Sequence, residues 1–299
     1  MPLEIELVLY TVVAPFAAAV AIAWLARQIL PVNIAERYSL GIALAVGFFT
    51  GYWLLPEWAP LVPEKHWQWL PYLAAAAVLG GLTQATGVSW VERLLAYALL
   101  ALVAAWQLVP LWPELQPPRP YTISLLAGYM FLLAALVAAL PDRLLGPLFV
   151  GLLTASAGAV ALLIAIGFSF QYGQIAALPA AALAGCFGAS FFIANRVLAI
   201  RGLLPVFAVL VGGMAFVGTI EPTTPMPIFL VAPAAPLMLW LFAAGPLGRL
   251  QGISAGTAQT IAVLVPLIIA LVIVALGNGE EEWGRGSSNE MLVGAVAGA

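Results

Sequence analysis

Apolar runs of about 20 residues follow one another along the chain, and short polar stretches separate them. A helix rises about 1.5 Å per residue, so about 20 residues cross the ~30 Å hydrocarbon core of a bilayer. The runs do not alternate with a period of two, as the strands of a membrane barrel do. The pattern predicts an all-α polytopic membrane bundle of about ten transmembrane helices in consecutive antiparallel hairpins. The expected helices cover residues 6–27, 37–55, 69–86, 92–111, 121–140, 144–167, 174–195, 202–220, 226–246 and 256–276.

Composition supports a lipid environment. Of the 299 residues, 64% are hydrophobic and 8% are charged, whereas about 25% of a soluble protein is charged. So few charges cannot cover the surface of a protein in water, so we expect the bilayer to be the solvent for most of the chain. Residues 1–276 are expected to form a single transmembrane domain. Residues 277–299 begin with a glycine- and glutamate-rich stretch and end in nine apolar residues, which predicts a flexible acidic tail with a short apolar end.

The basic residues indicate an orientation. When successive polar turns are placed alternately on two faces, the ten basic residues divide seven to three. One face holds Arg27, Arg37, Arg93, Arg143, Arg196, Arg201 and Arg249, and the other holds Lys65, Arg119 and Arg285. Basic residues in short loops favour the cytoplasmic side. We therefore expect the chain in the bacterial inner (cytoplasmic) membrane, with both termini on the extracytoplasmic side.

The longest polar break in the first half of the chain, residues 53–72, contains four tryptophans, the only histidine and the only lysine. Tryptophan gathers where hydrocarbon meets water, so this segment is expected to lie at the extracytoplasmic membrane surface. With neighbouring turns it forms a candidate rim for a partner or ligand: Trp58, Glu64, His66, Trp67, Trp69, Trp112, Arg119 and Glu221. A plain aromatic belt and a docking surface both fit this rim. Glu221, in a proline-rich turn, is the most plausible ligand-facing carboxylate, while His66 is expected in a solvated loop.

Other chemistry finds little support in the sequence. There is no basic run, so no nucleic-acid partner is expected. One histidine cannot build a multi-histidine metal site, and we expect no metal, cofactor or catalytic activity. Glu280, Glu281 and Arg285 have the spacing of a motif in membrane-embedded CAAX-type proteases, but here the motif lies among glycines and no histidine follows it. Cys186, in a run of small residues, is expected to be a buried hydrophobe.

The segment HWQWLPYL (66–73), with LVPEK before it, resembles stretches in uncharacterised multi-pass membrane proteins of planctomycete bacteria. That resemblance implies no activity.

Two functions stay open. No ionisable residue lies near the middle of an expected helix, and small-residue runs allow close helix packing, which favours a non-catalytic subunit or scaffold that contacts lipid and other membrane subunits. The alternative is a small-molecule transporter, since length and helix number are similar to those of the drug/metabolite transporter superfamily.

Overall fold

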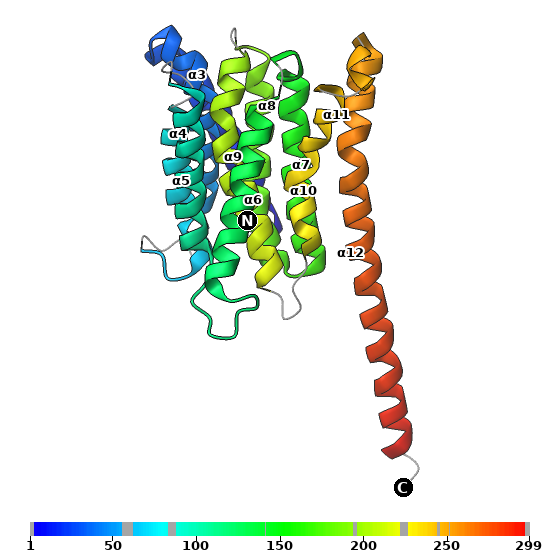
Figure 1. Ribbon diagram of the computed structural model, residues 1–299. Helices are drawn as coiled ribbons and strands as arrows, with labels where there is room; N and C mark the ends of the chain where they lie inside the picture. The colour runs from blue at the N-terminus through cyan, green and yellow to red at the C-terminus, as the bar shows by residue number, and fades with distance from the viewer. Residues whose placement is uncertain are drawn as a thin grey trace.

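The computed structural model describes residues 3–296, except 56–61, 83–87, 141, 194–195, 222–226, 244–245 and 251. Every regular element in these residues is helical, and the helices pack side by side in one bundle (Figure 1). The first elements are α1 (Leu3–Val8), the π-helical turn η1 (Leu9–Val13), α2 (Ala14–Ile29), α3 (Val32–Trp53), η2 (His66–Trp69), α4 (Leu70–Leu82), α5 (Trp90–Leu108) and α6 (Arg119–Ala138). Then come η3 (Asp142–Leu144), α7 (Pro147–Gly167), α8 (Phe170–Ser190), α9 (Arg196–Ile220), a broken segment described below, η6 (Pro246–Arg249) and α12 (Gly252–Val296).

Within the part of the chain that the structure describes, seven helices are long and apolar enough to cross a membrane: Glu6–Ile29, Trp90–Leu108, Arg119–Ala138, Pro147–Gly167, Phe170–Ser190, Arg196–Ile220 and Ile253–Gly277. The expectation of a helical membrane bundle is therefore confirmed in this coarser form. Helix α4 has only 13 residues, and the polar start of α3 lowers its mean hydropathy. The full count of ten spans and their hairpin order stay predictions.

Helix α9 occupies the middle of the bundle. Of the residues in its most apolar stretch, 94% are buried, and the helix packs against α3, α4, α5, α6, α7 and α8. Glycine permits one of these close approaches, because a Cβ atom on Gly41 of α3 would lie 2.6 Å from the carbonyl oxygen of Gly202. Cys186 is fully buried, as expected, and its thiol points at the carbonyl of Leu40. At these positions the small residues allow close packing inside the bundle.

One apolar segment of the bundle is broken. Residues Pro227–Ala243 form four short pieces: η4 (Pro227–Leu230), α10 (Val231–Ala234), η5 (Ala235–Leu239) and α11 (Trp240–Ala243). Prolines at 233 and 236 lack the N–H that a continuous α-helix needs. About 2.0 Å per residue in the 3₁₀ pieces and about 1.5 Å in the α pieces give a length of roughly 30 Å, which is similar to the hydrocarbon thickness.

Side chains from neighbouring helices hold the broken segment in place. The Tyr129 hydroxyl donates to the Leu230 carbonyl at 2.9 Å, and Ser156 of α7 donates to the carbonyl of Ala232. Arg143 donates to the Phe242 carbonyl at 3.0 Å. The α-helical donor to that carbonyl would be the N–H of residue 246, which is a proline. These contacts give three carbonyl groups of the broken segment hydrogen-bond partners on neighbouring parts of the bundle.

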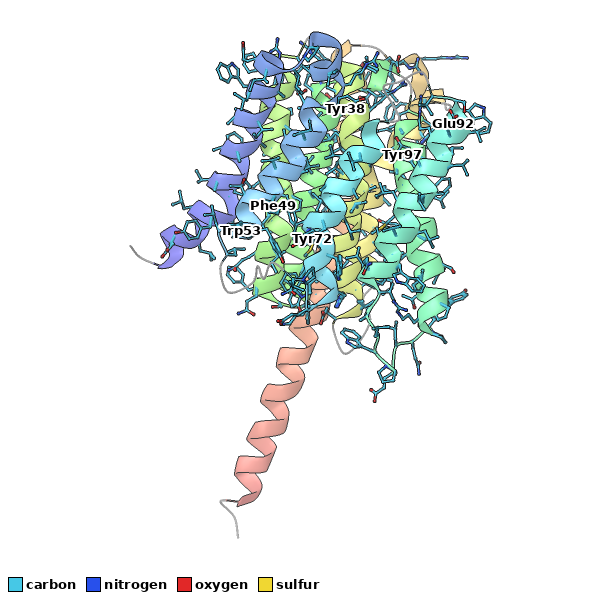
Figure 2. The ribbon with its side chains drawn as sticks, turned by 90° about the vertical axis from the view of Figure 1, so that its left-hand side faces the viewer. Tyr38, Phe49, Trp53, Tyr72, Glu92 and Tyr97 are labelled. Carbon is cyan, nitrogen blue, oxygen red and sulfur yellow. The ribbon has the colours of Figure 1, made fainter. Side chains whose placement is uncertain are left out.

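The two ends of the bundle differ in character. In Figure 2, Tyr38 and Glu92 lie toward one end, and Trp53 and Tyr72 lie toward the other. Contacts at the first end include an ion pair of 2.6 Å between Arg201 and Asp142. We call it the arginine-rich end and the opposite one the tryptophan-rich end.

Helix α12 continues past Gly277, where the flexible tail is expected to begin, as far as Val296. Its last part projects beyond the rest of the bundle at the tryptophan-rich end (Figures 1 and 2). The flexibility that is expected of this tail stays a prediction. The division of the chain at residue 277 stays a prediction.

Candidate functional site

A cavity of about 720 Å³ opens at the tryptophan-rich end, between α6, α9 and η4. We call it the rim cavity. Its wall is mostly apolar, with a few carboxyl, hydroxyl and amide groups, and it consists of Trp112, Glu114, Leu115, Gln116, Pro117, Thr122, Leu125, Leu126, Tyr129, Phe216, Thr219, Ile220, Glu221, Pro227 and Leu230. An apolar cleft of 300–1,000 Å³ with a few polar groups is typical of small-molecule sites.

The cavity extends into the bundle. Tyr129 lies ten positions after Arg119, the first residue of α6, which corresponds to roughly 15 Å along the helix. Its bond to Leu230 joins α6 to the first piece of the broken segment. The first piece of the broken segment, η4, thus forms part of the cavity wall through Pro227 and Leu230.

Two threonines of the wall donate to nearby backbone carbonyls, Thr122 to the turn before α6 and Thr219 to its own helix. Thr122 donates to the Pro117 carbonyl at 2.7 Å, and Thr219 donates to the Ala215 carbonyl at 2.8 Å. A hydroxyl that donates in this way keeps its lone pairs as acceptors. The walls can therefore accept hydrogen bonds from a ligand.

Glu221 and Glu114 are the two carboxyl residues of the cavity wall, and Glu221 directly follows α9. Its N–H donates to the Val217 carbonyl at 3.1 Å, so the backbone of α9 continues into the site and fixes this residue. The carboxyl is 17% exposed and hydrogen-bonds the hydroxyl of Tyr172, from α8. It is a partly shielded carboxyl at the mouth of an apolar cavity.

His66 lies beside this carboxyl. Its Nε2 is 3.4 Å from Glu221 Oε1, in a geometry that is not a hydrogen bond, and its side chain is 9% exposed. The rings of His66 and Trp112 meet edge to face at 5.6 Å. The structure buries this histidine rather than leaving it in a solvated loop.

Burial governs the ionisation of both groups. It lowers the pKa of His66 to about 4, with a smaller contribution from the nearby charge of Lys65. It also raises the pKa of Glu221, against the opposing effects of the Tyr172 hydrogen bond and Lys65. Both shifts favour uncharged forms, so at neutral pH the imidazole is neutral and the contact is not a salt bridge.

The three described tryptophans of the expected rim differ in burial and in their contacts. Trp67 is 1% exposed and packs edge to face against Tyr52 and Tyr172, so it belongs to the core. Trp112 is 42% exposed and lines the rim cavity. Trp69 packs against Tyr72 outside it.

The remaining residues of the expected rim are Arg119, Glu64 and Trp58. The guanidinium of Arg119 lies 4.8 Å above the Trp106 ring and donates to the carbonyls of Trp106 and Val109. The side chain of Glu64 is exposed, and its backbone N–H donates to Gln68. Trp58 lies outside the described residues. His66, Trp112 and Glu221 are thus the rim residues that the structure brings together at the cavity.

Sequence reasoning did not find the deeper part of this site. Gln116, Thr122 and Phe216 are ordinary residues for a loop or a membrane helix, and no spacing relates them. The proline density of 225–246 was the one available signal, because breaks in a membrane helix occur where the backbone lines a cavity or is buried in protein.

The described residues contain no group of three histidine, cysteine, aspartate or glutamate side chains suited to a metal ion. Glu221 and the aromatic wall suit an apolar molecule that carries a positive charge, because a carboxylate and an indole face both attract cations. Comparisons of this chain with protein-family models, with curated proteins and with solved structures found no match.

Proposed function

We propose that this chain is a non-catalytic carrier that binds an apolar cation in the rim cavity. The carrying observation is the cavity itself, with Glu221 at its mouth and a broken membrane segment in its wall. Discontinuous helices commonly form the substrate sites of transporters, because their irregular backbone can contact a ligand without meeting lipid. Of the two functions open from the sequence, this geometry favours the transporter.

The broken segment supports movement as well as binding. A Tyr129 hydrogen bond and one from Ser156 hold it to α6 and α7. A segment without a continuous helical hydrogen-bond ladder can change its shape at a lower cost than an intact helix. Rearrangement of Pro227–Ala243 would open the inner end of the cavity.

We propose with it a topology of ten spans, in which the broken segment is the ninth and both termini are extracytoplasmic. The cavity would then face the outside of the bacterial inner membrane. The arginine-rich end would face the cytoplasm, in agreement with the preference of basic residues.

A subunit or scaffold remains the second candidate, and α9 favours it. The centre of the bundle is filled by this helix, in whose apolar stretch 94% of the residues are buried. From Gly202 to Ile220 this helix has no ionisable side chain. Such a packed centre suits a protein that binds partners or a ligand without moving cargo. Mass spectrometry of the gently extracted native protein distinguishes the two, since stoichiometric partners support the scaffold.

Ethidium is a suitable probe for the carrier function, because it is aromatic, permanently cationic and small enough for the cavity. Proteoliposomes with trapped DNA would report its entry as a rise in fluorescence. The proposal expects faster entry than in protein-free liposomes and a loss of the difference with Glu221→Gln. Equal rates for the wild-type protein and empty liposomes would contradict transport of this class of cation.

A further inference from the structure

A second hollow lies on the side of the bundle between α2 and α8. It has a volume of about 780 Å³ and is lined by Phe16, Ala17, Val20, Ala21, Ala23, Trp24, Arg27, Gly188, Ala189, Phe192 and Ile193. We call it the side groove. Every lining residue except Arg27 is apolar, and the two helices belong to membrane-length spans.

The shape of the side groove follows from how the two helices separate. They touch at Gly185, where a Cβ atom would lie 2.6 Å from the Phe16 carbonyl oxygen. One turn later they have moved apart, because a Cβ atom on Gly188 would meet no heavy atom within 4 Å. The groove is therefore a wedge that widens toward the arginine-rich end.

Two arginines stand at the wide end. Arg27 donates to the Phe192 carbonyl at 2.5 Å. Arg196 donates to the carbonyls of Phe191 and Ile193 at 3.4 and 3.3 Å. These bonds hold both guanidinium groups at the turn that ends α8. Each guanidinium has five N–H donors, so these contacts leave donors for an anion.

The length of the groove matches one leaflet. Phe16 and Arg27 are eleven positions apart on α2, which corresponds to roughly 16 Å. That is about half of the ~30 Å hydrocarbon core. An apolar wedge of one leaflet's depth, with two cationic groups at the depth of the headgroups, is complementary to a phospholipid with an anionic headgroup.

We propose that the side groove binds an anionic phospholipid, with an acyl chain between α2 and α8 and the phosphate at Arg27 and Arg196. The site shares no residue with the rim cavity and does not depend on its function. A lipid held there would fill the wedge that the two helices leave open.

Native mass spectrometry in mild detergent tests this site with phosphatidylglycerol and phosphatidylcholine of the same chain length. Each basic group near an anionic headgroup contributes about a fivefold gain in binding. The wild-type protein should therefore bind phosphatidylglycerol at least about tenfold more tightly than phosphatidylcholine. The double variant Arg27→Gln/Arg196→Gln should bind the two lipids equally, and Arg27→Lys, which keeps the charge, should retain most of the preference.

Gly188→Leu provides a second test, because it fills the groove without touching the arginines. It should weaken the binding of both lipids. Gly158→Leu on α7, where a Cβ atom also has open space, should weaken the binding of neither. If the arginines only cap α8, their loss will lower the melting temperature in lipid-free micelles and leave the lipid preference unchanged. That outcome overturns the proposal, as does a wild-type dimer that Gly188→Leu converts to a monomer, since a second copy would then occupy the groove.

Discussion

The hydroxyl of Tyr129 donates a hydrogen bond of 2.9 Å to the backbone carbonyl of Leu230, 101 positions later in the chain. This contact joins α6 to the broken segment at the rim cavity. It places a polar group of an apolar helix against a carbonyl of an irregular backbone, and both residues line the cavity. The shape of the cavity therefore depends on it.

Tyr129→Phe should lower the free energy of unfolding by about 1 kcal/mol, because it removes this bond and adds no bulk. Thermal unfolding in detergent would show the loss as a lower melting temperature. Tyr121→Phe is the matched control, since Tyr121 is 60% exposed on the same helix. Equal melting temperatures for the two variants would show that the bond does not stabilise the broken segment.

Arg143→Met should also destabilise the broken segment, by about 1 kcal/mol, because the carbonyl of Phe242 loses its donor and residue 246 cannot replace it. Limited proteolysis and thermal unfolding would both detect the change. Arg249→Met removes an exposed arginine near the same end and should have little effect. A similar loss in both variants would point to general charge effects.

The lowered pKa of His66 predicts that the stability of the protein depends on pH. Its pKa is about 4 in the folded protein and 6.5 ordinarily, so the unfolded chain binds more protons between these values. The free energy of unfolding is therefore highest with respect to His66 above pH 6.5. It falls by about 1.4 kcal/mol per pH unit as the pH drops toward 4, or roughly 3 kcal/mol in all.

Melting temperatures of the wild-type protein and His66→Gln between pH 7.5 and 4.5 would measure this effect. The wild-type protein should lose stability relative to the variant as the pH falls. The raised pKa of Glu221 acts in the opposite direction, but Glu221 is present in both proteins. A constant difference across the pH range would mean that His66 is not held neutral by burial.

The basic residues predict the position of the C-terminus. A reporter that is active only in the cytoplasm should be silent when fused at residue 299, and active when fused after Leu250, between η6 and α12. The second fusion controls for expression. A bright signal at residue 299 would contradict either the ten spans or their orientation.

Much of the fold follows from the sequence because lipid imposes a simple rule: a helix of about 20 apolar residues satisfies its own backbone. The runs ending near Leu108 and Gly167 therefore appear where expected. The burial of His66 and Trp67 could not be read in this way, since tryptophan and histidine also suit a membrane surface. Their burial depends on contacts with Glu221 and Tyr172, which lie more than 100 positions away.

The candidate site was only partly predictable for the same reason. Glu221 was noticeable as a carboxylate in a proline-rich turn. The cavity beside it depends on how Phe216 of α9 and Leu126 of α6 leave space against η4, which is a property of packing. No local pattern in the chain specifies that space.

The binding of ethidium to the purified protein, followed by fluorescence anisotropy, tests the central proposal most directly. The wild-type protein should bind it, and Glu221→Gln should weaken binding about tenfold through loss of the charge-assisted contact. Glu64→Gln, which removes an exposed carboxylate at the same end, should bind as the wild type does.

The same measurement across pH tests the role of the carboxyl. Because burial raises the pKa of Glu221 above its ordinary 4.5, binding should weaken as the pH falls through that raised value and recover when it rises. Glu221→Gln should show no such transition. Wild-type binding that is independent of pH and equal to that of Glu221→Gln would contradict a cation site in the rim cavity.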